Sequence, residues 1–133
     1  MTSAFKTKGF ARFAKREGLP DEALCRAAEA IERGLIDADL GGGVVKQRLA
    51  RPGQGKSGGY RAIVAFRSRG RVVFVFGYAK SSRSGIDARE LAGFRLLAKH
   101  VLAMNVDDVA RAVAAGALEE VRCDAEAREA VRQ

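Results

Sequence analysis

The sequence lacks acidic residues over a long central stretch. Not one Asp or Glu occurs between Leu40 and Ile86, whereas the same stretch carries ten Lys and Arg. The other fourteen basic residues are slightly outnumbered by the sixteen acidic ones, so the formal net charge of +8 belongs to this stretch. A cationic segment without internal counter-charges repels itself until a polyanion or an acidic partner neutralises it. The alternative is a solvated basic face on an ordinary domain.

Other residue types are scarce as well. The longest apolar run, Val72–Ala79, has eight residues and is too short to span a bilayer, and no secretory signal is recognisable at the N-terminus.

Cys25 and Cys123 lack the spacing of metal ligands, so we expect a reduced cytoplasmic protein, with a single disulfide as the alternative. The only histidine, His100, is expected to interact with a helix C-terminus and not to take part in catalysis. We expect no metal site and no cofactor.

The length and composition are typical of one globular domain. With 133 residues, 47% hydrophobic and 30% charged, the chain is large enough to bury a core. We expect a single domain over residues 1–121. The segment 122–133 alternates Ala, Glu and Arg with little apolar content, which predicts a frayed or disordered tail.

Helical patterns flank the basic stretch. Apolar spacing predicts a helix over residues 8–17, ended by Gly18, and a second helix that begins after Pro20 and runs to about Leu35 with that leucine on its apolar side. Asp87 and Glu90 have the spacing of a capping box at the start of a third helix, which Asn105 ends. A fourth helix is expected over residues 107–115, before a glycine.

The basic stretch itself has strand patterns. Residues 44–50, 60–67 and 71–80 predict three strands joined as antiparallel hairpins. The third is apolar on both sides, with Val73 and Val75 on one face and Phe74, Phe76 and Tyr78 on the other, as in a central strand. Residues 4–5 are expected to form a short edge strand, and residues 118–121 a last strand or extended arm. The predicted class is α+β: two N-terminal helices packed on a small antiparallel sheet of three to four strands, with C-terminal helices.

One segment resembles a nucleotide-binding loop. Ala50–Ser57 reads ARPGQGKS, but a phosphate-cradling loop needs a helix after it and a carboxylate that helps to hold magnesium. Here a strand follows and the surrounding stretch has no carboxylate. We therefore interpret the segment as a glycine-rich hairpin loop that carries Lys56.

A basic group on the strands is the strongest candidate site. Strand alternation places Lys46 and Arg48 on one face, with Val45 and Leu49 on the other. In an antiparallel meander these two residues can converge with the start of the second strand and the end of the third. The candidate catalytic residues are Lys46, Arg48, Arg61, Lys80 and Arg83, and Tyr60 and Tyr78 are candidates for stacking on RNA bases. Arg67, Arg69 and Arg71, around the hairpin turn, are expected to be solvated charges.

The runs KQRLARPGQGKSGGYRAIVAFR and VVFVFGYAKSSRS carry a resemblance to a known family. Together with FKTKGFARFAKREGL and RGLIDADLGGGVVKQRLA, they make residues 5–121 similar to RelE-type toxins of bacterial toxin–antitoxin modules (the RelE/HigB/ParE superfamily). The resemblance implies two helices on a small antiparallel sheet with a C-terminal helix. It also implies an mRNA interferase, a metal-independent endoribonuclease that cuts mRNA on the translating ribosome and is silenced by a cognate antitoxin.

The resemblance carries over to particular positions. It matches Lys46 and Arg48, the pair Tyr60-Arg61, and Lys80 and Arg83 to the family's basic site, while Ser81 and Asp87 stand where some members have Arg and Tyr. In such an enzyme the 2′-hydroxyl of RNA attacks the adjacent phosphate, and fixed cations stabilise the charge that develops.

Specific roles follow from this chemistry. Lys46 is expected to be the general base, its charged form disfavoured by neighbouring cations, or an electrostatic stabiliser. Arg61 is expected to clamp the phosphate, Lys80 or Arg83 to stabilise the leaving side, and Arg51 and Lys56 to hold flanking phosphates of mRNA or ribosomal RNA.

Two alternatives remain open at this point. A ParE-like toxin has the same fold and poisons gyrase without cutting RNA. A non-catalytic module that binds RNA or the ribosome would use the same cations for affinity alone, with a steep salt dependence.

Overall fold

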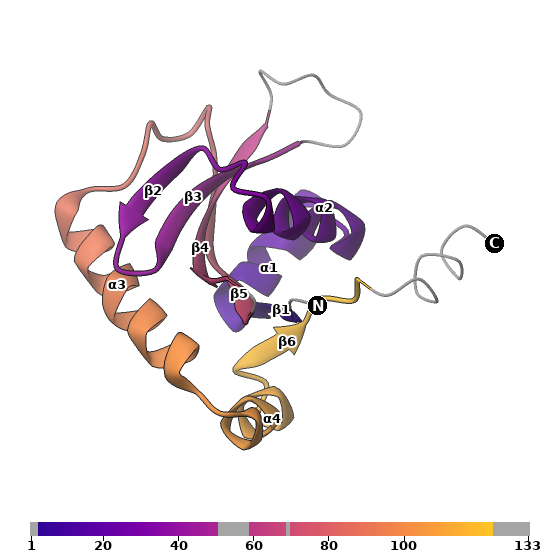
Figure 1. Ribbon diagram of the computed structural model, residues 1–133. Coiled ribbons are helices and arrows are strands. Elements are labelled where there is room, and N and C mark those ends of the chain that lie inside the picture. Colours follow the sequence, from indigo (N-terminus) through magenta and orange to yellow (C-terminus); the bar gives the residue numbers. More distant parts are fainter. Residues whose placement is uncertain (1–2, 51–58, 69, 124–133) are drawn as a thin grey trace.

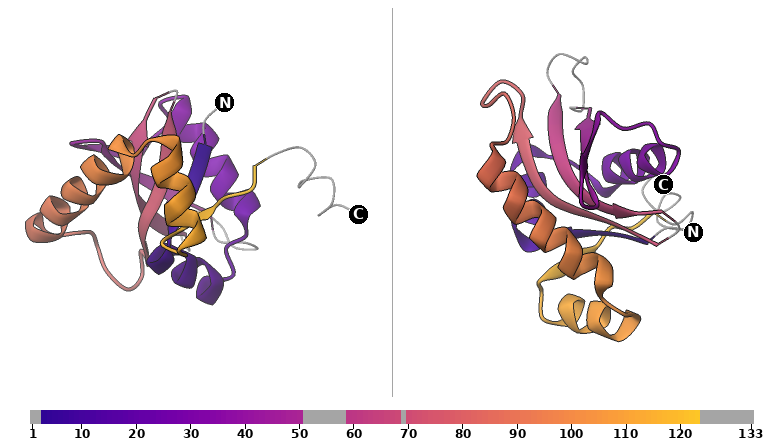
Figure 2. Two further views of the ribbon diagram at one scale, coloured as in Figure 1. Left: turned by 90° about the horizontal axis from the view of Figure 1, so that it is seen from below. Right: turned by 60° about the vertical axis from the view of Figure 1, so that its left-hand side comes forward.

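The computed structural model describes residues 3–50, 59–68 and 70–123, which form a mixed α+β fold (Figure 1). One six-stranded sheet runs through its middle in the order β2-β3-β4-β5-β1-β6. Helices α1 and α2 cover one face of the sheet, and α3 packs on the other (Figures 1 and 2). The elements are β1 (Ser3–Thr7), α1 (Lys8–Glu17), α2 (Asp21–Glu32), β2 (Ala38–Gly41), β3 (Val44–Leu49), β4 (Tyr60–Arg67), β5 (Arg71–Ala79), α3 (Ala88–Ala103), α4 (Val106–Ala114) and β6 (Leu118–Glu120).

The sheet is larger than predicted and is not purely antiparallel. Strand β1 lies between β5 and β6, parallel to β5 and antiparallel to β6, so the expectation of an edge strand there is wrong. Strand β2 was not predicted, and it pairs with β3 at the other edge. Strand β1 pairs with strands that are distant in the sequence, and β2 pairs with β3 across a tight turn. The local alternation of apolar and polar residues does not encode either pairing.

The two N-terminal helices follow their local signals closely. Helix α1 ends at Gly18, whose φ of 69° is the left-handed conformation that glycine adopts without strain. Helix α2 begins after Pro20 with Asp21 and Glu22 in its first turn. It ends at Glu32, earlier than predicted, and Leu35 is 64% exposed instead of buried.

Strand β5 contains a bulge that changes which residues share a face. Its register with β4 shifts between Ile63, which pairs with Phe76, and Val64, which pairs with Phe74. The extra residue reverses the alternation beyond it. As a result Phe76 and Tyr78 lie on the α3 face together with Val73, and the predicted grouping of Phe76 and Tyr78 with Phe74 is wrong.

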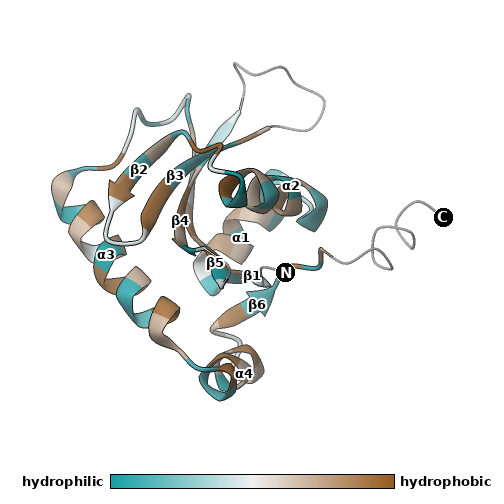
Figure 3. Ribbon diagram, viewed as in Figure 1, coloured by the Kyte–Doolittle hydropathy of each residue, from teal (hydrophilic) through white to brown (hydrophobic). Residues whose placement is uncertain are grey.

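The sheet separates two hydrophobic clusters. One fills the space under α1 and α2, and the other lies under α3 and α4. In Figure 3 the helices alternate between hydrophobic and hydrophilic colours, as amphipathic helices do. Under α1, the ring of Phe13 lies so close to Gly77 that a Cβ added there would collide with its Cε2 and Cδ2 atoms. Gly77 therefore allows α1 to pack directly on β5.

The C-terminal elements are fixed by caps. Asp87 and Glu90 form the predicted capping box of α3, and Asn105 and Asp108 form another at the start of α4. Arg71 donates hydrogen bonds to the carbonyl oxygens of Val101 (2.6 Å) and Met104 (3.0 Å), at the C-terminus of α3. It is therefore a helix cap and not the solvated charge that was predicted. Arg69 lies outside the described residues.

The two cysteines are joined, which corrects the expectation of free thiols. The Sγ atoms of Cys25, on α2, and Cys123, beyond β6, are 2.15 Å apart, and their Cα atoms are 5.4 Å apart. The bond ties the segment after β6 to α2. The predicted tail beyond residue 123 lies outside the described residues. No helix of the described chain combines the length and apolar character of a membrane span.

Candidate functional site

Three of the candidate side chains lie in one row across the sheet. Arg48 on β3 is directly opposite Arg61 on β4, and Arg61 is directly opposite Tyr78 on β5. Residues opposite each other in a ladder point to the same face, which here is the α3 face. Lys46 is two residues from Arg48 on the same strand and shares that face. The predicted convergence of the first and second strands is therefore present in the sheet.

Asp37 connects two of these cations. Its Oδ2 accepts a hydrogen bond from Nε of Arg61 at 3.1 Å and lies 3.9 Å from Nζ of Lys46. Arg61 is only 8% exposed and also donates to the backbone oxygen of Tyr60 at 3.4 Å. A buried guanidinium needs such partners. Asp37 thus holds Arg61 in a fixed orientation beside Lys46.

A second ion pair lies beside the row. Arg83 donates to Oε1 of Glu90 at 2.5 Å and to the backbone oxygen of Gly85 at 2.9 Å. Its guanidinium carbon lies 5.5 Å from the ring centroids of both Phe76 and Tyr78. Contacts with two aromatic faces and a carboxylate order the segment between β5 and α3.

Two pKa values respond to this arrangement. The hydrogen bond from Arg83 is the main reason that the pKa of Glu90 lies below its ordinary value, so this carboxylate stays charged. Burial is the main reason that the pKa of Tyr78 is raised, although the nearby positive charges of Arg61 and Arg83 act in the opposite direction. Tyr78 is therefore a neutral hydroxyl at physiological pH.

The structure separates Tyr60 from the site. It is 1% exposed and packs edge-on against Phe13 on the α1 face, with ring centroids 5.6 Å apart. Tyr60 lies on the opposite side of the sheet from Arg61 because adjacent residues of a strand point to opposite faces. Tyr60 is therefore not placed to stack on an RNA base at the candidate site.

Three other candidates are Lys80, Arg51 and Lys56. Lys80 is the first residue after β5; it is exposed, and its backbone N–H donates to Gly59 at 3.5 Å. Arg51 and Lys56 lie outside the described residues.

Sequence reasoning missed both carboxylates of the site. Asp37 precedes the acid-free stretch, in the loop before β2, and Glu90 was recognised only as a cap. The pairing of β2 with β3 brings Asp37 to Lys46, whose backbone oxygen accepts the N–H of Asp37 at 3.0 Å. The described residues contain no group of three or more His, Cys, Asp or Glu side chains that could hold a metal ion. The arrangement is a cationic surface with two internal carboxylates, suited to a phosphate.

Comparison with protein families gives a match over nearly the whole chain. The family described as the RelE toxin of the RelE/RelB toxin-antitoxin system matches residues 2–121. No curated protein matches the chain.

Proposed function

The chain belongs to the RelE toxin family, and on that premise we propose that it is an mRNA interferase. As a RelE toxin it is one half of a toxin–antitoxin pair and has a cognate antitoxin as its partner. The proposed activity is cleavage of mRNA on the translating ribosome in the cytoplasm, without a metal or cofactor. Cleavage there stops protein synthesis.

The row formed by Arg48 and Arg61 is the observation that carries this proposal. Two arginines directly opposite each other in a ladder repel, and Asp37 offsets this repulsion at Arg61, whereas no carboxylate of the described residues lies within salt-bridge distance of Arg48. Such a departure from favourable pairing is expected where function requires it. An RNA phosphate would relieve the repulsion, since it offers acceptors to both guanidinium groups.

The proposed reaction needs no redox or metal step. The 2′-hydroxyl oxygen bonds to the adjacent phosphorus and loses its proton, while the bond to the 5′-oxygen breaks and that oxygen gains a proton. The products are a 2′,3′-cyclic phosphate and a 5′-hydroxyl. Arg61, held by Asp37, and Lys46 stabilise the negative charge on the phosphorane oxygens, and each such donor contributes on the order of 3 kcal/mol to transition-state stabilisation. Arg83 and Lys80 stabilise the leaving oxygen.

A reporter mRNA in a translating extract tests the proposal. We expect the protein to create new 5′-hydroxyl ends within the reading frame, with EDTA-treated purified protein retaining its activity. The double variant Lys46→Ala, Arg61→Ala is expected to lose at least a hundredfold in cleavage rate. Undiminished cleavage by this variant would refute the site. Inhibition of gyrase supercoiling without any cleavage would instead indicate a ParE-like toxin.

A further inference from the structure

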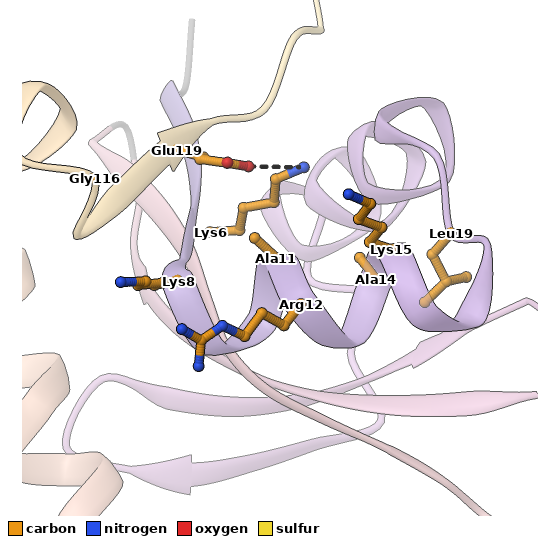
Figure 4. Close-up of a pocket in the computed structure, with 9 residues that line it drawn as sticks. All are labelled: Lys6, Lys8, Ala11, Arg12, Ala14, Lys15, Leu19, Gly116 and Glu119. Atoms are coloured by element: carbon orange, nitrogen blue, oxygen red, sulfur yellow. Dashed lines mark ion pairs between the residues drawn. The ribbon is translucent and has the colours of Figure 1, made fainter.

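A second basic site lies on the other side of the molecule. A cleft of about 400 Å³ between α1 and β6 is lined mainly by cations, Lys6, Lys8, Arg12 and Lys15, together with Leu19 and Glu119 (Figure 4). It lies against the helices that cover the face opposite Arg61, and β6 is the edge strand farthest from β2. The cleft is therefore separate from the candidate active site.

Three cations of the cleft form a row on one helix. Lys8, Arg12 and Lys15 are spaced at i, i+4 and i+7 along α1, which places them on the same exposed face over about 10 Å. Within the described part of the chain none of the three has a carboxylate within salt-bridge distance.

Lys6, the fourth cation, has a different role. Its Nζ is 2.9 Å from Oδ1 of Asp21 and 3.6 Å from Oε2 of Glu119, the pair that Figure 4 marks with a dashed line. Lys6 thus ties β1 to α2 and β6. The row on α1 is left to bind an external anion.

The floor of the cleft decides which anion it suits. Ala14 is 2% exposed and Leu19 is 6% exposed, so both are already covered by their own chain. An acidic peptide helix needs an apolar groove in which to bury anchor residues, and little apolar area remains here to bury. No aromatic side chain lines the cleft among the described residues, so bases have no stacking platform. A cleft that binds through charge alone favours a ligand with closely spaced negative charges, such as the backbone of a nucleic acid.

We propose that Lys8, Arg12 and Lys15 form a second RNA-binding site that grips the sugar–phosphate backbone of a folded RNA segment. This inference rests on the proposed action on RNA. The candidate active site takes the strand to be cut, and the cleft holds another segment through its phosphates, without reading its sequence. Two such contacts on opposite sides of one small protein increase its residence on a large RNA particle.

The test measures binding of an RNA that the protein cannot cut. The probe is a 2′-O-methyl RNA hairpin, which lacks the attacking hydroxyl, so that binding is read separately from cleavage. The cleft variant is Lys8→Gln, Arg12→Gln, Lys15→Gln. The matched control is Arg33→Gln, Arg89→Gln, Lys99→Gln, which removes the same charge from exposed positions elsewhere. Circular dichroism establishes that both variants fold.

We expect the cleft variant to bind the hairpin at least tenfold more weakly than the control. The slope of log K against log salt should fall by about 2 to 3, because each phosphate contact contributes about 0.7 to 0.9. Equal binding by the two variants overturns the proposal. The proposal is also overturned if the cleft variant keeps its affinity for the hairpin but loses affinity for poly-L-glutamate, because the cleft then binds an acidic protein. If the unmodified protein does not cleave mRNA yet the cleft variant still loses hairpin affinity, the proposed function fails and the cleft stands.

Discussion

Asp37 accepts a hydrogen bond from Nε of Arg61 at 3.1 Å although 24 residues separate them in the sequence. The same oxygen lies 3.9 Å from Nζ of Lys46. One carboxylate therefore orients one cation of the candidate active site and lies beside another. It also neutralises part of the positive charge that would attract an RNA phosphate. Its removal should therefore strengthen RNA binding and weaken catalysis.

Replacement Asp37→Asn separates these effects. Without the negative charge, we expect KM for RNA to fall by about threefold to tenfold, because attraction for phosphate increases. The turnover rate should fall by on the order of tenfold, because Arg61 loses its fixed orientation. Steady-state cleavage kinetics provide the measurement, and Asp39→Asn, two residues further on in strand β2, is the control. An unchanged KM and kcat would show that Asp37 has no part in the site.

Gly77 is predicted to tolerate no side chain. A methyl group in Gly77→Ala would collide with the ring of Phe13, and overpacking of this kind costs about 1–3 kcal/mol of unfolding free energy. Gly93→Ala, at an open helical position of α3, should instead be neutral or stabilising by up to about 1 kcal/mol. Urea denaturation of both variants tests the contrast, and equal stability would contradict the close packing of α1 on β5.

The disulfide between Cys25 and Cys123 should make stability depend on redox conditions. It closes a loop with a sequence separation of 98, for which chain entropy predicts a contribution of about 4–5 kcal/mol. Dithiothreitol should therefore lower the melting temperature of the natural protein. The double variant Cys25→Ser, Cys123→Ser should melt at the lower temperature with or without the reductant. A melting temperature that is insensitive to dithiothreitol would contradict the bond.

Glu90 should contribute stability at neutral pH that is lost in acid. Its pKa is lower in the folded protein than its ordinary value of 4.5, chiefly because of the hydrogen bond from Arg83. The contribution is therefore complete above that ordinary value and disappears as the pH falls through the lowered folded pKa. Melting temperatures of the natural protein and Glu90→Gln should differ at pH 7 and converge as the pH is lowered below the folded pKa of Glu90. A difference that is constant with pH would exclude this origin.

Local signals in the sequence predicted the elements well. Gly18 and the capping box of Asp87 and Glu90 define helix ends through their own backbone geometry, and strand alternation placed Lys46 and Arg48 opposite Val45 and Leu49. These features depend on neighbours within a few residues, which a sequence displays directly.

Features that depend on long-range pairing were missed. The parallel pairing of Phe5 with Val73, the bulge near Phe76 and the contact of Asp37 with Arg61 each join segments that sequence patterns treat separately. The cation-rich face was therefore predictable from charge and alternation. Its internal carboxylates were not, because their positions follow from the order of strands in the sheet.

The attack of a 2′-hydroxyl on its phosphate, assisted by Lys46 and Arg61, is tested most directly by a single substitution in the RNA. Ribosomes programmed with a defined mRNA would be treated with the protein, and the cleaved site would then be remade with one 2′-deoxynucleotide before the scissile bond. We predict a 2′,3′-cyclic phosphate product from the natural mRNA and no cleavage at the deoxy position. Cleavage that persists at the deoxy position would contradict the mechanism.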